Sequence, residues 1–234
     1  MPLPILNSPK FNLTIPSSKK SLEYRPYLIK EEKILLIAQE SKDSNSIISA
    51  IQELIEACTF GKIKVSELTM FDMEYIFLKI RAKSVGEIIK LKTKCPTDEQ
   101  ENEITVNLDE LEVEFPKVSP KIPLKDKVGI VMKYPSFADV KAISKIKEDD
   151  KIKILNSTVI SCIDYIYDAD AVYKASETPN KELEVFVDSL SSKQFQEIQN
   201  FISSIPKVKY ETKVKCSKCG TEYPVVLEGI QSFF

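Results

Sequence analysis

The stretch VKCSKCGTEYPVVL (residues 214–227) places Cys216 and Cys219 in a Cys-x-x-Cys-Gly turn between two expected strands. A turn of this form often holds a metal ion through its two thiolates. A structural zinc site needs four ligands, and this stretch supplies only two of them. The chain contains no histidine, so the other ligands would have to be cysteine or carboxylate side chains from elsewhere in the sequence.

A second copy of the same pattern lies earlier in the chain. Residues 68–106 align with residues 190–227, first at an offset of 122 and then, after the loss of one residue between helix and strand, at an offset of 121. The matched pairs are Leu68 and Leu190, Met73 and Phe195, Ile76 and Ile198, Ile80 and Ile202, Cys95 and Cys216, Ile104 and Val225, and Val106 and Leu227. An internal repeat of this kind predicts two copies of one unit, here helix, strand, turn and strand.

The two turns, which we call the first knuckle (residues 95–98) and the second knuckle (residues 216–219), differ at their last position. Asp98 stands where the second copy has Cys219, and aspartate is an acceptable zinc ligand beside thiolates. If the knuckles lie at one shared end of the protein, Cys95, Asp98, Cys216 and Cys219 can form one four-ligand site. If they lie at opposite ends, each is only a tight turn. We favour metal-free turns, because the first copy lacks one of its cysteines, and so we expect no cofactor, with structural zinc as the alternative.

The composition is that of a globular protein with a substantial core. The chain has 234 residues, of which 43% are hydrophobic and 29% charged, with a formal net charge of −2. No apolar run reaches the length of about 18 residues that a membrane-spanning helix needs, so we expect no membrane partner. The N-terminus shows no secretory signal, and the five cysteines are an odd number, so we expect reduced thiols.

Several absences argue against an enzyme. Without histidine, the commonest general base and the usual nucleophile pairs are missing. The five glycines form no phosphate-binding loop, and so we expect no small-molecule substrate. Only Arg25 and Arg81 are arginines, against 31 lysines, and arginine is the preferred residue for recognising phosphates and base edges. We therefore expect a non-enzymatic protein that does not bind nucleic acid.

The periodicity predicts an α+β fold with an N-terminal β-hairpin, helices, and two helix-strand-knuckle-strand repeats that end in zinc-ribbon-like hairpins. Apolar residues alternate from Phe11 to Ile15 and again up to Tyr24, which is typical of a hairpin. The expected helices are 28–41, 43–60, 66–84, a helical region within 136–168, and 191–205, the last opened by a Ser191–Gln194 capping box. Residues 175–182 are expected to form a surface loop.

The expected division of the chain has three parts. Residues 1–10, which are rich in proline, form an extended N-terminal arm. Residues 11–115 carry the hairpin, the first helices and the first repeat, and residues 116–234 carry the second helical segment and the second repeat. We expect the last two parts to form one compact unit.

Three blocks carry a resemblance to a known family. They are IPSSKKSLEYRPYLIKEEKILLIAQES (15–41), LTMFDMEYIFLKIRAKSVGE (68–87) and the two knuckle hairpins. In this order they resemble the baseplate hub proteins of T-even-like bacteriophages with contractile tails. The resemblance implies a structural or assembly component of the central hub, which acts through contacts with other hub subunits. It also implies a location in the baseplate of the virion tail, and in the host cytoplasm during assembly.

The resemblance also implies which residues have partner-binding or structural roles. These are Arg25, Pro26, Tyr27, Glu31, Glu32, Phe71, Asp72, Arg81 and Ser84. Arg25 lies in the first block and Arg81 in the second. In these blocks Glu31, Glu32 and Asp72 can accept charge-assisted hydrogen bonds.

The alternative function is a viral zinc-ribbon regulator that binds nucleic acid. Such a protein needs a basic face. Lysines are balanced by acidic residues along every segment of this chain, which favours the baseplate component.

Overall fold

The computed structural model describes residues 7–41, 44–147 and 149–233. Most of the arm expected at residues 1–10 therefore lies outside the described residues. None of the described helices is both long enough and apolar enough to cross a membrane.

Contacts divide the chain into two compact units. Unit 1 contains the chain up to Val65, Phe71–Glu114, and the residues from Lys207 onward, and unit 2 contains Ser66–Met70 and Phe115–Pro206. The C-terminal hairpin thus belongs with the N-terminal segments, although the sequence division placed it with residues 116–234. The expected three-part division and the expectation of one compact unit stay predictions.

Unit 1 begins with the hairpin expected from the sequence. Strands β1 (Phe11–Thr14) and β2 (Ser21–Tyr24) pair antiparallel, with Leu13 opposite Leu22. Helices α1 (Ile29–Ser41), α2 (Ser44–Cys58) and α3 (Met70–Val85) follow, with a 3-10 turn at Val65–Glu67. The fully buried side chains of α2 and α3 form much of the core: Ile51, Leu54, Ile55, Cys58, Phe71, Met73, Ile76, Phe77, Leu78 and Ile80.

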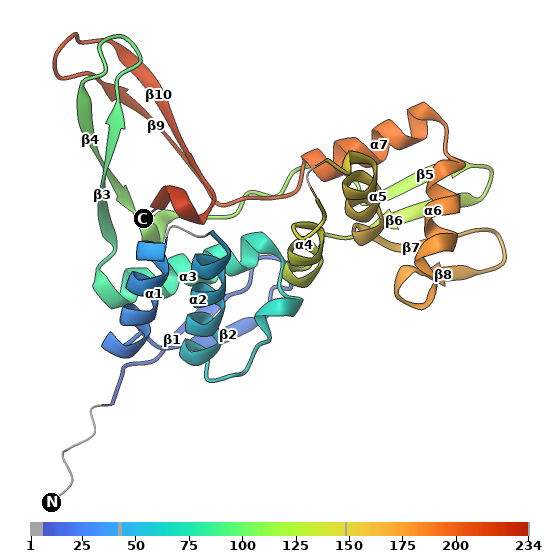
Figure 1. The fold of residues 1–234 in the computed structure, drawn as a ribbon, viewed down its shortest axis with the longest axis horizontal. Helices are drawn as coiled ribbons and strands as arrows, with labels where there is room; N and C mark the ends of the chain where they lie inside the picture. The colour runs from blue at the N-terminus through green and yellow to red at the C-terminus, as the bar shows by residue number, and fades with distance from the viewer. Residues whose placement is uncertain (1–6, 42–43, 148, 234) are drawn as a thin grey trace, which may run out of the picture. The chain divides into compact units, whose positions relative to one another are not determined.

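The two repeats end in separate two-stranded hairpins. Strands β3 (Ile88–Lys94) and β4 (Glu101–Asn107) form the first hairpin, and β9 (Lys209–Lys215) and β10 (Glu222–Glu228) form the second. Side chains alternate between buried and exposed along both hairpins, as a strand with one covered face requires. Both hairpins belong to unit 1, and they converge at their turns (Figure 1).

The described part of unit 2 contains one antiparallel sheet and four helices, three of which share an apolar cluster with the sheet. The sheet has the order β5 (Lys121–Lys125), β6 (Val128–Met132), β7 (Ile163–Tyr167) and β8 (Val172–Lys174). The helices are α4 (Phe137–Ile143), α5 (Lys151–Ser161), α6 (Asn180–Asp188) and α7 (Ser192–Ser203). Sheet residues and helix residues share one apolar cluster that includes Ile130, Ile166, Val159, Leu183 and Phe201.

The α+β fold and the repeated helix-strand-turn-strand unit are confirmed. The predicted capping box is also present, since Ser191 N donates to Gln194 Oε1 at 2.8 Å. The helix of the second repeat, α7, belongs to unit 2, whereas its hairpin belongs to unit 1.

Three expected boundaries are wrong. The helical region does not extend to residue 168, because α5 ends at Ser161 and the β-prone run IDYIY forms strand β7. The expected loop at 175–182 contains the start of α6 at Asn180. The third helix begins at Met70 and not at residue 66, since a 3-10 turn precedes it.

Candidate functional site

The two knuckles have the same backbone geometry. In the first, Cys95 N donates to Gln100 O at 2.9 Å and Glu99 N donates to Cys95 O at 3.0 Å. In the second, Cys216 N donates to Thr221 O at 2.9 Å and Gly220 N donates to Cys216 O at 3.0 Å. Glu99 and Gly220 both have a positive φ, which glycine adopts without steric cost. The repeat therefore extends to individual hydrogen bonds.

The knuckle geometry does not itself require a metal. The turn of the N-terminal hairpin has the same two bonds, from Ile15 N to Lys20 O and from Lys19 N to Ile15 O, both at 2.9 Å. Lys19 has the matching positive φ of 57°. Because this turn has no cysteine, the turn form alone is no evidence for a bound ion.

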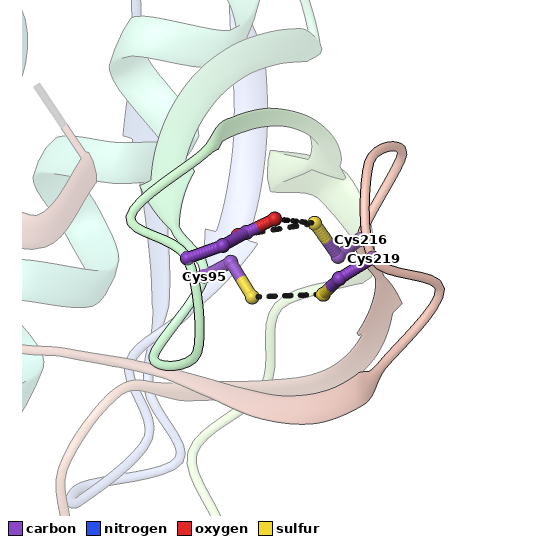
Figure 2. A group of neighbouring side chains, drawn as sticks. Cys95, Cys216 and Cys219 are labelled. Carbon is purple, nitrogen blue, oxygen red and sulfur yellow. Dashed lines mark hydrogen bonds between the residues drawn. The ribbon is translucent and has the colours of Figure 1, made fainter.

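The folded chain brings the two knuckles together at one end of unit 1. Cys95 Sγ lies 3.7 Å from Cys219 Sγ, and Cys216 Sγ lies 3.5 Å from Asp98 Oδ1 (Figure 2). The four ligand atoms all lie within 4.8 Å of one another. Of the two arrangements considered from the sequence, the structure has the shared end and not the opposite ends, and these four residues are the ones that could hold a metal.

The contacts in this cluster follow an approximate twofold relation. An offset of 121 residues converts Cys95 into Cys216 and Asp98 into Cys219. The contact between Cys95 and Cys219 therefore corresponds to the contact between Cys216 and Asp98. Each knuckle contributes one buried thiol, Cys95 or Cys216, and one more accessible ligand.

A buried amide joins the knuckles beside the cluster. Asn102 Oδ1 accepts hydrogen bonds from Ser217 N at 2.9 Å and from Ser217 Oγ at 3.0 Å. Asn102 Nδ2 donates to Tyr223 Oη at 3.2 Å, and Tyr223 occupies the position in the second copy that Asn102 has in the first. The position matching Ser217 is Pro96, which has no N–H, so the symmetric partner of the Ser217 bond cannot form.

The pKa values of Cys216, Cys95 and Asp98 are shifted for different reasons. Backbone N–H groups of Cys219 and Lys218 lower the pKa of the Cys216 thiol below its ordinary value. Burial raises the pKa of Cys95, against the opposing effect of the N–H groups of Thr97 and Asp98. A hydrogen bond from Cys95 lowers the pKa of the Asp98 carboxyl.

The motif residues form a second polar group in unit 1, centred on a buried ion pair. Arg25 Nη2 lies 2.9 Å from Glu31 Oε1, and both side chains are largely buried. Glu31 Oε2 accepts a bond from Leu28 N at 2.8 Å, at the start of α1, and Arg25 Nη1 donates to Pro26 O at 2.9 Å. Arg25 N also donates to Cys58 O at 3.0 Å, which ties this segment to the end of α2.

Cys58 and Cys162 are core residues, as the sequence led us to expect. Both thiols are fully buried, and burial raises the pKa of each to about 11. They lie in different units, since Cys162 is part of the apolar cluster of unit 2.

The other motif residues of the second block lie along α3. Asp72 is fully buried, and its Oδ1 accepts a bond from Ser17 N at 2.9 Å in the turn of the N-terminal hairpin, while Ser17 Oγ donates to its other oxygen. Ser84 Oγ accepts a bond from Tyr27 N at 2.9 Å. These contacts attach the first block to α3, on which Phe71 is also buried.

Arg81 differs from Arg25. Its Nη1 is buried and has no hydrogen-bond partner within the part of the chain that the structure describes. Burial lowers the pKa of its guanidinium, an effect that the nearby Tyr27 opposes. Glu32, in the first turn of α1, is half-buried, and its backbone N donates to Leu28 O at 3.0 Å.

Sequence reasoning missed Asn102, Ser217, Tyr223 and Ser17. The repeat offset pairs Asn102 with Tyr223, and two polar side chains at matched positions on the covered faces of two hairpins were the available signal. No comparable signal marked Ser17, because its partner Asp72 is 55 residues away.

Comparison with known proteins shows that a family model matches nearly the whole chain. The model described as T4 bacteriophage base plate protein matches residues 8–234. No curated protein and no solved structure matches the chain.

The buried ion pair generates a stability prediction. Glu31→Gln removes one charge and leaves Arg25 buried without its counter-ion, so we expect a loss of about 3–5 kcal/mol in the free energy of unfolding. Lys30→Gln is the matched control: the exposed Lys30 Nζ also lies near Glu31 Oε1, at 3.5 Å, and its loss should change stability by about 1 kcal/mol or less. Urea unfolding at pH 7 measures both. Equal effects of the two substitutions would contradict the structural role of the pair.

The same pair predicts a pH dependence. Burial tends to raise the pKa of Glu31, but hydrogen bonds from Arg25 and Leu28 N outweigh it, and the pKa is lower than its ordinary value. A carboxyl with a lowered pKa contributes stability above its unfolded pKa and loses it as the pH falls through the folded value. The stability difference between the unmodified chain and Glu31→Gln should therefore shrink as the pH falls below about 4.

Proposed function

The chain belongs to the family of T4 bacteriophage base plate proteins, and we propose that within the baseplate it is a non-enzymatic structural or assembly component of the central hub. Membership of this family indicates a structural role in the phage baseplate and a location in the virion tail. The hub position is supported by the resemblance of the blocks at residues 15–41 and 68–87, which contact each other in unit 1 through Tyr27 N and Ser84 Oγ. We propose assembly of a contractile tail in the host cytoplasm as its setting.

The outward face of α1 is the observation that supports a function through protein–protein contacts. This helix buries Glu31, Leu35 and Ala38 on its inner side. Its outer side also carries large apolar residues, since Ile29, Leu36 and Ile37 are 66%, 53% and 68% exposed. These three residues, at spacing i, i+7 and i+8, lie on one face of a helix. We call them the α1 outer face.

An exposed apolar face of this kind is typical of a protein interface. The polar contacts of Glu31 with Arg25 and with Leu28 N fix the start of α1, so that its outer face is presented on a rigid element. We propose other hub subunits of the same phage as the partners that cover it.

The alternative, a nucleic-acid-binding regulator, needs lysines free to contact phosphates. Many lysines of the two hairpins are instead paired with glutamates. Lys90 lies 2.9 Å from Glu103 and Lys92 lies 3.1 Å from Glu101 on the first hairpin, and on the second Lys209 pairs with Glu211. We therefore propose that the partners of the protein do not include nucleic acid.

The α1 outer face gives the main test. Ile37→Glu should leave the free energy of unfolding within about 0.5 kcal/mol, because the residue is exposed, but should abolish recovery of the chain with co-expressed baseplate proteins of the same phage. Val185→Glu is the matched control: Val185 is 70% exposed on α6, in unit 2. Affinity purification followed by mass spectrometry measures the recovery. Full recovery with Ile37→Glu, or equal loss with Val185→Glu, would exclude the α1 outer face as the interface.

The charge pairing gives a second test. The unmodified chain should pass through a heparin column at moderate salt, because its hairpin lysines face glutamates. The double substitution Glu101→Lys and Glu103→Lys removes these partners and should increase retention, which serves as the positive control. Strong retention of the unmodified chain, lost as the salt rises, would support the nucleic-acid-binding regulator instead.

A further inference from the structure

We propose that Cys95, Asp98, Cys216 and Cys219 bind one zinc ion, which joins the two hairpins of unit 1 at their knuckles. This inference does not depend on the proposed role in the baseplate. It rests on the positions of the four side chains and on the groups that surround them.

Two contacts between the knuckles match the edges of a zinc tetrahedron. Zinc–sulfur bonds of about 2.3 Å and zinc–oxygen bonds of about 2.1 Å in tetrahedral geometry separate two sulfurs by about 3.8 Å, and a sulfur from an oxygen by about 3.6 Å. The observed separations are 3.7 Å between Cys95 Sγ and Cys219 Sγ, and 3.5 Å between Cys216 Sγ and Asp98 Oδ1. A pair of thiol hydrogen bonds would explain each contact separately, but gives no reason for all four ligand atoms to lie within 4.8 Å of one another.

Backbone groups support both buried sulfurs in the same way. Cys95 receives hydrogen bonds from the N–H groups of Thr97 and Asp98, and Cys216 receives them from Lys218 and Cys219. These donors stand two and three residues after each cysteine. N–H groups directed at a sulfur stabilise the thiolate that a metal requires and orient it. The turn at Ile15–Lys20 has the same backbone hydrogen bonds but no cysteine, so its N–H groups have no sulfur to stabilise.

The ligand set indicates the metal and its role. Three thiolates and one carboxylate are soft enough to exclude magnesium and calcium, and a tetrahedral site of this type suits zinc. Since the protein would supply all four ligands, no coordination position remains for a substrate, which is typical of a structural site. The ion would connect residues 95–98 with residues 216–219 and so fix the two hairpins to each other.

Zinc content provides the first part of the test. Reduced protein expressed with zinc and washed with a weak chelator should contain about one zinc per chain. Cys216→Ser and Asp98→Ala should each lower the zinc affinity by more than about 100-fold, as expected for the loss of a ligand. Cys162→Ala is the matched control, since this buried cysteine lies in unit 2, and it should retain the full content. Elemental analysis and competition with a chromogenic chelator measure both quantities.

A gain of ligand keeps the test independent of misfolding. Asp98→Cys gives the first knuckle a Cys-x-x-Cys pair like that of the second knuckle. This variant should bind zinc at least about 10-fold more tightly, since a softer thiolate replaces the carboxylate. With cobalt in place of zinc, the unmodified protein should show the intense visible absorption of a tetrahedral site. Its thiolate charge-transfer band should grow in Asp98→Cys, which reports the fourth sulfur directly.

Three results would overturn the proposal. The first is a folded, reduced protein that carries no zinc and gives no tetrahedral cobalt spectrum. The second is full zinc content in Cys216→Ser. The third is a disulfide between Cys95 and Cys219 in protein purified without oxidant, seen as a mass two hydrogens lower, because the two sulfurs would then be unable to bind the ion as thiolates.

Discussion

A two-stranded hairpin is at best marginally stable by itself in water, and each repeat of this chain ends in one that joins no larger sheet within the described residues. Their stability therefore depends on how each covers its apolar face. Ile104 and Val106 on the first hairpin and Val225 on the second are buried. At the tips, the buried Asn102 amide makes hydrogen bonds to both Ser217 and Tyr223. A buried amide is costly to leave unpaired, so the hydrogen bonds of Asn102 favour a single register of one hairpin against the other.

Other contacts in unit 1 are consistent with a single register of the two hairpins. Once the tips are in register, the knuckles are opposite each other, and Cys95 and Asp98 lie beside Cys219 and Cys216. Further from the knuckles, the Arg25–Glu31 pair and the Asp72–Ser17 bond attach the N-terminal segment to the helices. In unit 2, the sheet and helices α5, α6 and α7 share a continuous apolar cluster. Unit 1 combines its own apolar core in α2 and α3 with these polar contacts, and it also presents the apolar outer face of α1.

Local patterns predicted much of this fold. The capping box at Ser191 and the two hairpin turns depend on residues a few positions apart, and the repeat needed only a self-comparison of the sequence. Strand β7 was missed because the five-residue run IDYIY, which follows a helix, has no decisive period. The four candidate ligands were identifiable from the repeat, but whether the knuckles meet depends on how two hairpins dock. The Asn102 and Ser17 contacts were beyond local reasoning for the same reason, since they join segments 115 and 55 residues apart.

The central claim is that the two knuckles, distant in sequence, face each other in one fixed register. The most direct measurement is a nuclear Overhauser contact between the side-chain amide protons of Asn102 and the ring protons of Tyr223, whose hydroxyl oxygen lies 3.2 Å from Asn102 Nδ2. The structure predicts a strong cross-peak, which Tyr223→Phe should weaken without changing the cross-strand contacts inside each hairpin. If each hairpin shows only its own internal contacts, and none between Asn102 and Tyr223, the account of paired knuckles is contradicted.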